Sequence, residues 1–310
     1  MSSLSFMSFL YAAEINPESA KIAGKIPIAD LHMHPNPKIS PKHMRSKMDN
    51  NGVRWAGSGA IRGRRVPWER YAKALGERYI PFAGQSELNI IYKNEGMAAM
   101  LDDKNAGIQQ LYAAVEEDFK AGRIKGVGEI FINNERSHPR GWFRRKGRTD
   151  APSIRLFYGL AAKYGGFLTF HMHGDSDSME QLDALLASDR NGRVILNHCG
   201  IEADASTLRT AFARNPNLLC EISFRYSPMI KSHWRTYSER KMFDEDGIDD
   251  DWLKLIEEFP DRFMIGTDAR GEDQYGEAIE TVRKGLLPYL RPETARKFVF
   301  GNSKKLFDLK

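Results

Sequence analysis

The sequence is poor in cysteine and has no long hydrophobic run. Only Cys199 and Cys220 occur among its 310 residues, which excludes a disulfide-rich framework and a metal site made of cysteine alone. Both lie in apolar segments, so we expect buried free thiols in a reducing compartment. No run of about 18 apolar residues occurs, so we expect no membrane span.

The N-terminal segment lacks the charge pattern of a secretory signal. Residues 5–13 (SFMSFLYAA) are apolar, but no Lys or Arg precedes them, as a signal normally requires. We therefore expect residues 1–25 to be an extension packed on the main domain, with a signal as the alternative. This favours a cytoplasmic protein and leaves a secreted or periplasmic location open.

Several catalytic motifs are also absent. The sequence has no P-loop, no nucleotide-binding glycine fingerprint after a strand, no Cys-x-x-Cys, no Gly-x-Ser-x-Gly and no His-Glu-x-x-His. The formal net charge is +5 with 28% charged residues, a mild basic excess that is compatible with anionic ligands. A small-molecule substrate is therefore favoured over nucleic acid, no membrane partner is expected, and a homo-oligomer is compatible with the sequence.

Short, apolar, β-rich segments alternate with helical patterns along the chain. The eight expected strands cover residues 26–31, 52–56, 79–83, 124–130, 166–170, 193–197, 217–222 and 262–266. Alternation of this kind predicts right-handed crossovers and a parallel sheet, and eight repeats predict an α/β fold closed into a (β/α)8 TIM barrel. We assign residues 26–310 to this single domain. Its long loops (35–41, 57–67, 132–150 and 223–249) each follow a strand, and should lie at the C-terminal face of the barrel.

Acidic and imidazole side chains stand at the ends of these strands. The candidate metal ligands are His32, His34, Glu129, His171, His198 and Asp268. Residues two apart on a strand point the same way, so a His-x-His pair presents two nitrogens to one site. Such nitrogen and oxygen donors suit a divalent ion, with zinc favoured and manganese, iron or cobalt compatible. The number of ions, one or two, stays open.

Two of these residues are also candidate catalytic groups. A bound cation lowers the pKa of water, so a modest base is sufficient, and Asp268 is the candidate base and later acid. His198 either ligates a second ion or polarises a substrate oxygen. Glu129 is a ligand or the partner of an arginine, because a buried carboxylate needs compensation.

Four further residues are candidate substrate contacts. His173 follows the fifth strand and is equally compatible with a supporting or a loop role. Arg140 and Trp142 lie in a basic loop with interspersed aromatic residues, which suits an anionic or planar ligand. Arg225 follows the seventh strand and could line the opposite wall of the site. A solvated loop is the alternative for the basic segment.

The chain resembles the amidohydrolase superfamily of metal-dependent hydrolases, over residues 26–309. The resemblance rests on ADLHMH, GVGEI, TFHMHGD, VILNHCG, RFMIGTDA and FVFGNSKKLF. It is nearest to the amidohydrolase-related subgroup of TIM-barrel hydrolases. It implies that His32, His34, His171 and Asp268 are metal ligands and that His198 is the sixth-strand histidine. Many two-metal members have a carboxylated lysine after the fourth strand, where this chain has Glu129.

The main functional hypothesis is a metal-dependent hydrolase that acts on a small amide, ester or lactone. The first alternative is a metal-dependent decarboxylase of an aromatic acid. The second is a TatD-like phosphoesterase or nuclease that uses the basic loop, although Thr267 stands where those enzymes typically have a glutamate. A barrel without catalysis that serves as a binding module is the last alternative.

Overall fold

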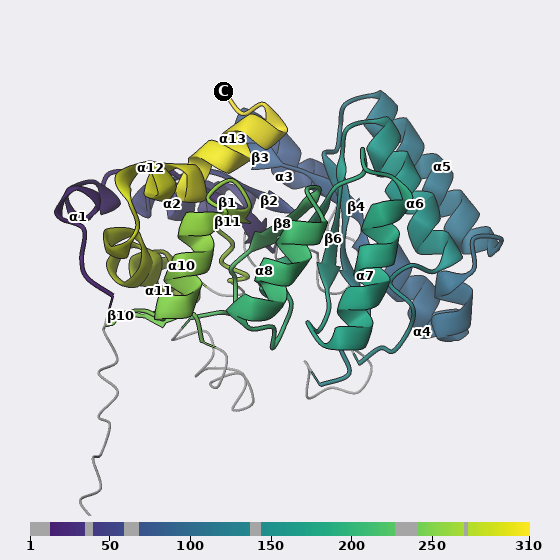
Figure 1. Ribbon diagram of the computed structural model, residues 1–310. Coiled ribbons are helices and arrows are strands. Elements are labelled where there is room, and N and C mark those ends of the chain that lie inside the picture. Colours follow the sequence, from purple (N-terminus) through teal and green to yellow (C-terminus); the bar gives the residue numbers. More distant parts are fainter. Residues whose placement is uncertain (1–12, 35–39, 59–67, 137–143, 227–240, 270–271) are drawn as a thin grey trace, which may run out of the picture.

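The strands form an almost continuous ring of parallel neighbours. A computed structural model of the protein describes residues 13–34, 40–58, 68–136, 144–226, 241–269 and 272–310 (Figure 1). One parallel sheet has the order β1-β2-β3 and a second has the order β11-β8-β7-β6-β5-β4. Their bounds are β1 Ile28–Met33, β2 Val53–Ser58, β3 Tyr79–Ile80, β4 Phe82–Gly84, β5 Gly126–Phe131, β6 Phe167–His171, β7 Val194–Leu196, β8 Leu218–Glu221 and β11 Phe263–Met264.

Two junctions join these sheets into a barrel. Only Pro81 separates β3 from β4, so the two short strands continue one another. On the other side, Asp30 of β1 bridges Ile265 beyond β11, and the Leu31 N–H donates to the Ile265 carbonyl at 2.9 Å. The described strands therefore occupy the eight positions that the sequence predicts, and the (β/α)8 prediction is confirmed.

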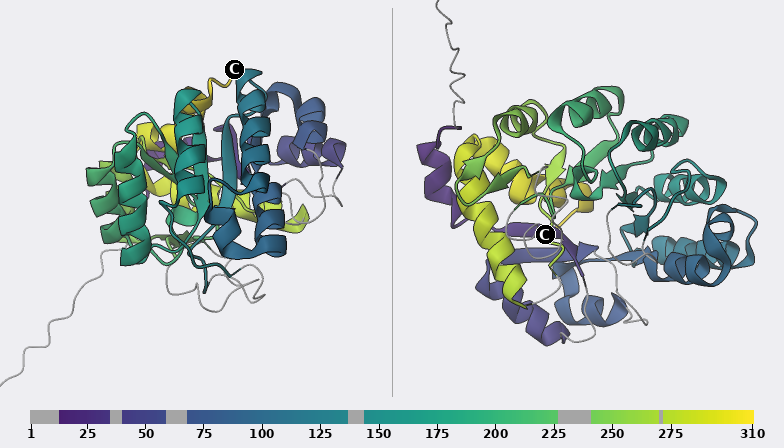
Figure 2. Two further views of the ribbon diagram at one scale, coloured as in Figure 1. Left: turned by 90° about the vertical axis from the view of Figure 1, so that its right-hand side faces the viewer. Right: turned by 90° about the horizontal axis from the view of Figure 1, so that it is seen from below.

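Helices surround this ring, as the view from below shows (Figure 2). They are α1 Pro17–Ala23, α2 Pro41–Asn50, α3 Trp68–Leu75, α4 Gln85–Leu101, α5 Ala106–Lys120, α6 Pro152–Lys163, α7 Ser176–Ser188, α8 Ala205–Arg214, α10 Asp250–Glu258, α11 Glu272–Thr281, α12 Pro292–Arg296 and α13 Asn302–Phe307. A small antiparallel pair, β9 Phe243–Asp244 with β10 Gly247–Ile248, lies in the loop after β8. No described helix is long and apolar enough to cross a bilayer.

Side-chain caps explain several helix starts. Asn16, Asp175, Asp204 and Asp249 each accept a backbone N–H from the first turn of α1, α7, α8 and α10. At α6 the cap position is Ala151, without a side-chain hydrogen bond, because the Asp150 carboxylate pairs with Arg148 and Arg155 instead.

Apolar side chains fill the interior of the barrel. Alternate residues of several strands, such as Leu31, Ile195 and Leu219, form an inner cluster. Phe307 of the C-terminal helix joins it, with its ring 5.0 Å from that of Phe167. Since the interior is packed, polar chemistry is left to the ends of the strands.

The part of the N-terminal extension that the structure describes packs on the barrel. The Asn16 N–H donates to the Pro288 carbonyl at 2.7 Å, and Ser19 Oγ donates to the Leu290 carbonyl at 2.6 Å. Residues 1–12, where a signal would lie, are outside the described residues. The boundary at residue 25 stays a prediction.

Candidate metal centre

The predicted ligands meet at the carboxyl ends of the strands. His32 lies in β1, Glu129 in β5 and His171 at the end of β6, while His198 follows β7 and Asp268 follows β11. Carboxyl ends of parallel strands share one rim of a barrel, which brings residues far apart in sequence together. Each of these five residues is at most 8% exposed.

A first donor group gathers around His32. Its Nε2 lies 3.1 Å from His34 Nε2, 3.6 Å from Glu129 Oε2 and 3.7 Å from Asp268 Oδ1, and His34 Nε2 lies 2.5 Å from Asp268 Oδ1. Ligands about 2.0–2.1 Å from a tetrahedral ion stand roughly 3.3 Å apart. The observed spacings bracket that value, so these residues fit a divalent ion.

A second donor group adjoins the first. His171 Nδ1 lies 2.9 Å from both Glu129 Oε1 and His198 Nε2, and His198 Nε2 lies 3.4 Å from Glu129 Oε1. At 2.9 Å, the lone pairs of His171 Nδ1 and His198 Nε2 would repel one another. A proton between the two nitrogens, or a bound cation, removes this repulsion. His171, which the family resemblance groups with His32 and His34, thus belongs to a separate cluster around Glu129.

Glu129 belongs to both groups through different oxygens. Gln85 of α4 donates its side-chain amide to Glu129 Oε2 at 3.3 Å. Burial raises the pKa of Glu129, but the charge of His32 and the hydrogen bonds from His171 and His198 outweigh burial and leave this pKa well below its ordinary value. The carboxylate is therefore ionised and ready to accept cations.

The sequence analysis missed Glu221, which is buried at the end of β8. Its Oε1 lies 2.7 Å from His32 Nδ1 and accepts the His198 backbone N–H at 3.0 Å. Ser223 adds two hydrogen bonds, from Oγ to Oε1 at 2.8 Å and from its N–H to Oε2 at 2.7 Å. A proton on His32 Nδ1 then leaves the Nε2 lone pair directed at the first donor group, as a ligand requires.

Ser223 fixes the ring of His198 in the same way. His198 Nδ1 lies 2.8 Å from Ser223 Oγ and 3.1 Å from the Ser223 carbonyl. The carbonyl can only accept, so this contact favours a proton on Nδ1 and a lone pair on Nε2. His198 therefore presents an acceptor, and not a donor, to the second group.

Charge and burial act in opposite directions on two of the imidazoles. Burial lowers the pKa of His32, but the charges of Glu129, Glu221 and Asp268 outweigh it and leave this pKa well above its ordinary value. For His171, burial prevails over the attraction of Glu129 and lowers the pKa to about 4. His171 is thus neutral at physiological pH, as a ligand must be.

Asp30 anchors the segment that carries Asp268. Its carboxylate, fully buried below the site, accepts the Thr267 N–H at 2.9 Å and the Thr267 hydroxyl at 2.8 Å. The Asp268 N–H donates to the His32 carbonyl at 2.7 Å, and Asp268 has a left-handed backbone with φ of 47°. These bonds hold the Asp268 side chain toward the first donor group.

Glycine at position 266 permits this crowded arrangement. A Cβ there would lie 1.9 Å from Glu221 Oε2 and 2.8 Å from the Cβ of His32. Any larger residue at the end of β11 would displace the carboxylate that holds His32.

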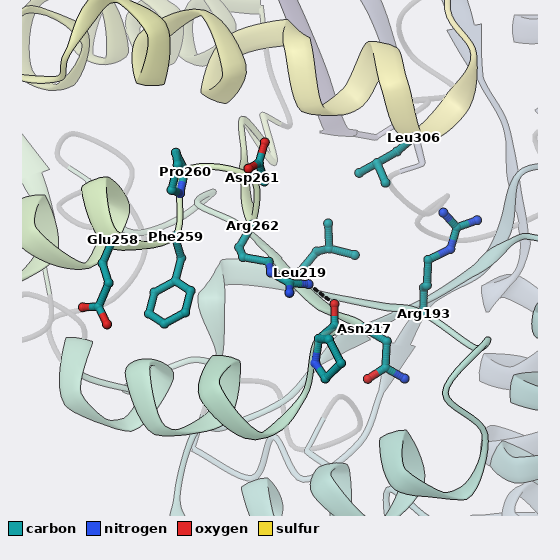
Figure 3. A pocket seen from close by; sticks show the side chains of 10 residues that line it. Arg193, Asn217, Leu219, Glu258, Phe259, Pro260, Asp261, Arg262 and Leu306 are labelled. Carbon is teal, nitrogen blue, oxygen red and sulfur yellow. Dashed lines mark hydrogen bonds between the residues drawn. The ribbon is translucent and has the colours of Figure 1, made fainter.

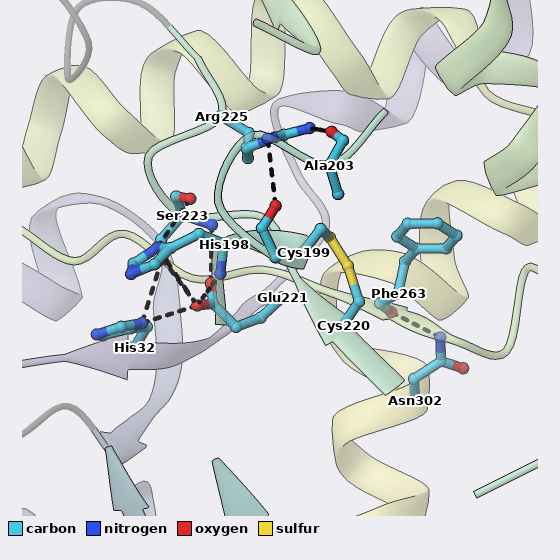
Figure 4. The surroundings of a disulfide bond; sticks show 11 residues. His32, His198, Cys199, Ala203, Cys220, Glu221, Ser223, Arg225, Phe263 and Asn302 are labelled. Atoms are coloured by element: carbon cyan, nitrogen blue, oxygen red, sulfur yellow. Dashed lines mark hydrogen bonds and ion pairs between the residues drawn. A yellow bond between two sulfur atoms is a disulfide. The ribbon is translucent and has the colours of Figure 1, made fainter. Parts of the chain in front are cut away.

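The structure joins Cys199 and Cys220 in a disulfide, and the prediction of free thiols is wrong (Figure 4). Cys199 follows β7 and Cys220 lies in the adjacent strand β8, so parallel pairing brings their Cα atoms to 4.9 Å, within the usual range for a disulfide. Each cysteine directly adjoins a residue of the site, His198 in one case and Glu221 in the other.

The predicted substrate contacts have diverse surroundings. His173 Nε2 accepts the Arg136 backbone N–H at 3.0 Å, and the side chain is 1% exposed. Arg225 is buried, donates to the Ala203 carbonyl and lies over the Trp252 ring at 4.8 Å. Their role toward a substrate stays a prediction. Arg140 and Trp142 lie outside the described residues.

No family model matches the chain, and no curated protein sequence matches it. Solved structures do match it. A putative amidohydrolase from Staphylococcus aureus superposes with a TM-score of 0.56 at 11% identity, over 92% of this chain and 100% of that one. A probable 2-pyrone-4,6-dicarboxylic acid hydrolase from Acinetobacter baumannii gives 0.55 at 11% identity, over 91% and 100%.

A third match is a dihydroxybenzoic acid decarboxylase from Polaromonas sp. JS666, solved with manganese. Its TM-score is 0.53 at 12% identity, over 92% of this chain and 97% of that one. At this identity the likeness establishes the fold. The names of the three matched structures are those of an amidohydrolase, a hydrolase and a decarboxylase.

Proposed function

We propose that this protein is a metal-dependent hydrolase that cleaves a small amide, ester or lactone. Glu129 is the observation that carries the proposal: its two oxygens face separate donor groups, at 3.6 Å from His32 Nε2 and 2.9 Å from His171 Nδ1. A carboxylate so placed is suited to bridge two cations. We therefore assign two adjacent ions to the centre.

The positions and chemical types of the donor atoms determine which residues we assign to each ion. His32, His34 and Asp268 would hold the first ion with Glu129 Oε2, and the remaining donors would hold the second. These are His171 and His198, with Glu129 Oε1. Imidazole and carboxylate donors favour zinc, and manganese, iron and cobalt are compatible. A bound divalent ion supplies Lewis acidity, which polarises a carbonyl oxygen and acidifies water.

Asp268 is the proposed base. Its buried carboxylate belongs to the first donor group, where it accepts the proton of the attacking water and then delivers it to the leaving nitrogen or oxygen. His198 is assigned as a ligand, because its Nδ1 bonds to Ser223 and its Nε2 then lacks the proton that stabilisation of an oxyanion requires.

Metal analysis combined with hydrolysis assays tests the proposal. We expect two zinc ions per chain, hydrolysis within a panel of esters and lactones, and loss of activity on chelation. Glu129→Gln should reduce metal content and abolish hydrolysis. The control is Glu116→Gln, which removes a half-buried carboxylate of α5 paired with the exposed Lys163 and Lys120. Hydrolysis that persists after complete chelation would refute the proposal.

Decarboxylation is the second candidate. It is favoured by the match to the manganese-containing decarboxylase over nearly the whole chain. Dihydroxybenzoates incubated with the metal-loaded protein distinguish the two functions. Release of carbon dioxide, together with no hydrolysis of any ester or lactone in the panel, would support decarboxylation over the hydrolase.

The disulfide is informative about the cellular compartment of the protein. A buried disulfide favours an oxidising compartment, in contrast to the cytoplasmic location that free thiols would suggest. We therefore propose a non-cytoplasmic location, which fractionation of the native cells would test. Oligomeric state stays a prediction.

A further inference from the structure

A cavity lined by polar and apolar side chains lies at the end of the barrel opposite the metal centre. Figure 3 shows the side chains that line it. The cavity has a volume of about 300 Å³ and is formed at the amino ends of three adjacent strands. Arg193 directly precedes β7, Asn217 precedes β8 and Arg262 precedes β11. Because the strand order is β11-β8-β7, the two arginines stand on either side of β8. Strands two apart are separated by roughly 10 Å.

Both arginines bond only to main-chain carbonyls within the part of the chain that the structure describes. Arg193 lies over the Phe167 ring, 4.0 Å from its centroid, and donates to the Gly165 carbonyl. Arg262 donates to the carbonyls of Pro216 and Leu218. A guanidinium has five N–H donors, so each group retains donors beyond these contacts.

The acidic residues of the cavity wall are paired elsewhere. Glu258 Oε2 lies 2.8 Å from Arg209 Nε, and Asp261 Oδ1 lies 3.2 Å from Lys297 Nζ. The two arginines therefore provide positive charge that no described carboxylate neutralises at ion-pair distance. Partial burial disfavours the charged form of Arg193 and lowers its pKa. An anion bound in the cavity would compensate this charge and would itself be stabilised by it.

Apolar side chains line the cavity beside the two arginines and the amide of Asn217. Leu219 of β8 and Leu306 of α13 line the cavity (Figure 3), as do Pro216 and Phe259. Bare phosphate or sulfate would leave these apolar side chains unused, whereas a carboxylate on a hydrocarbon body would cover them. The volume is at the lower end of the range for small-molecule sites.

We propose that this basal cavity is a ligand site, separate from the metal centre, which binds a small organic carboxylate between Arg193 and Arg262. The carboxylate accepts N–H donors from the guanidinium groups, and its apolar body packs on Leu219 and Leu306. The proposal does not depend on the reaction at the metal centre.

Calorimetry with benzoate tests this site in the metal-loaded protein at constant ionic strength. We expect benzoate to bind, and benzamide, which has the same shape without charge, to bind at least about tenfold more weakly. Loss of a charge-assisted hydrogen bond reduces affinity by about tenfold or more, so Arg193→Gln and Arg262→Gln should each do so. Arg214→Gln is the matched control, because this exposed arginine pairs with Asp183 outside the cavity.

A crystal soaked with 4-bromobenzoate locates the ligand directly. We expect anomalous bromine density beside Leu219 and Leu306. Density only at the metal centre, or benzoate affinity unchanged in both arginine variants, would overturn the proposal. Density at the base without calorimetric binding would mean binding at crystal concentration only, and would overturn it as well.

Discussion

Replacement of Glu221 by glutamine should weaken metal binding without removing any ligand. The carboxylate accepts hydrogen bonds from His32 Nδ1, the His198 N–H and Ser223 at Oε1, and from the Ser223 N–H at Oε2. Glutamine has nearly the same volume, so no cavity forms. However, both carboxylate oxygens of Glu221 accept hydrogen bonds from N–H or O–H groups. The NH2 group of glutamine must replace one of these oxygens and cannot accept a hydrogen bond.

The less damaging orientation of the amide places NH2 against the Ser223 N–H. One buried hydrogen bond is then lost and a donor is left unsatisfied, which costs about 1–3 kcal/mol of folding stability. His32 also loses the negative charge that pairs with its Nδ1–H, and replacement of such supporting groups reduces metal affinity by about 10–100-fold. Burial of 99% of Glu221 means that water does not compensate.

Zinc titration with a competing chelator measures the affinity, and urea unfolding of the metal-free protein measures the stability. Glu116→Gln is the control, because its ion pairs are with exposed lysines, such surface pairs contribute only about 0–1 kcal/mol, and Glu116 lies in α5, away from the strand ends. Zinc affinity of Glu221→Gln within about twofold of the wild type would refute the role of Glu221 in orienting His32.

Three further predictions follow from the same contacts. Because Asp268 is also a proposed ligand of the first ion, Asp268→Asn is assayed at a zinc concentration that fills both sites. Its kcat should then fall by about 10²–10⁴-fold, and steady-state kinetics with near wild-type kcat would exclude Asp268 as the base. Because the pKa of His32 is raised, its imidazole is protonated in the metal-free protein at neutral pH. Zinc binding must displace this proton and weaken as pH falls, and calorimetry in buffers of different ionisation heat detects the release. Finally, Cys199 and Cys220 should resist iodoacetamide in the denatured, non-reduced protein and react after reduction; mass spectrometry that finds both alkylated without reductant would contradict the disulfide.

The barrel could be predicted from the sequence because each strand is short, apolar and bounded by turn residues or by a helical pattern. Each predicted strand overlaps an observed one, and the strand-end rule brought His32, Glu129 and Asp268 to one rim. Such a rule identifies the rim that a residue occupies, but it does not give the distances across the rim. The division of the ligands around Glu129 therefore required coordinates.

Glu221 and the disulfide escaped sequence analysis for a related reason. The carboxylate of Glu221 ends an apolar run, LLCEIS, and so carries the same signal as Glu129, but it lies inside the predicted strand 217–222. Cys199 and Cys220 lie at the ends of neighbouring strands, and strand adjacency was itself part of the prediction. The predicted adjacency of these two strands could have indicated that the two cysteines pair. The number of cysteines alone could not indicate this.

The basal cavity and the metal centre share strands but should function independently. Arg193 and His198 lie at opposite ends of β7, and Arg262 and Asp268 at opposite ends of β11, roughly 15–20 Å apart at the rise of a strand. Between them the interior is filled by side chains such as Leu219, which is 4% exposed, and close-packed interiors deform little. Benzoate at the base should therefore leave both zinc affinity and the KM for an ester unchanged. Competitive inhibition would place benzoate among the metal ligands instead, and would contradict a separate basal site.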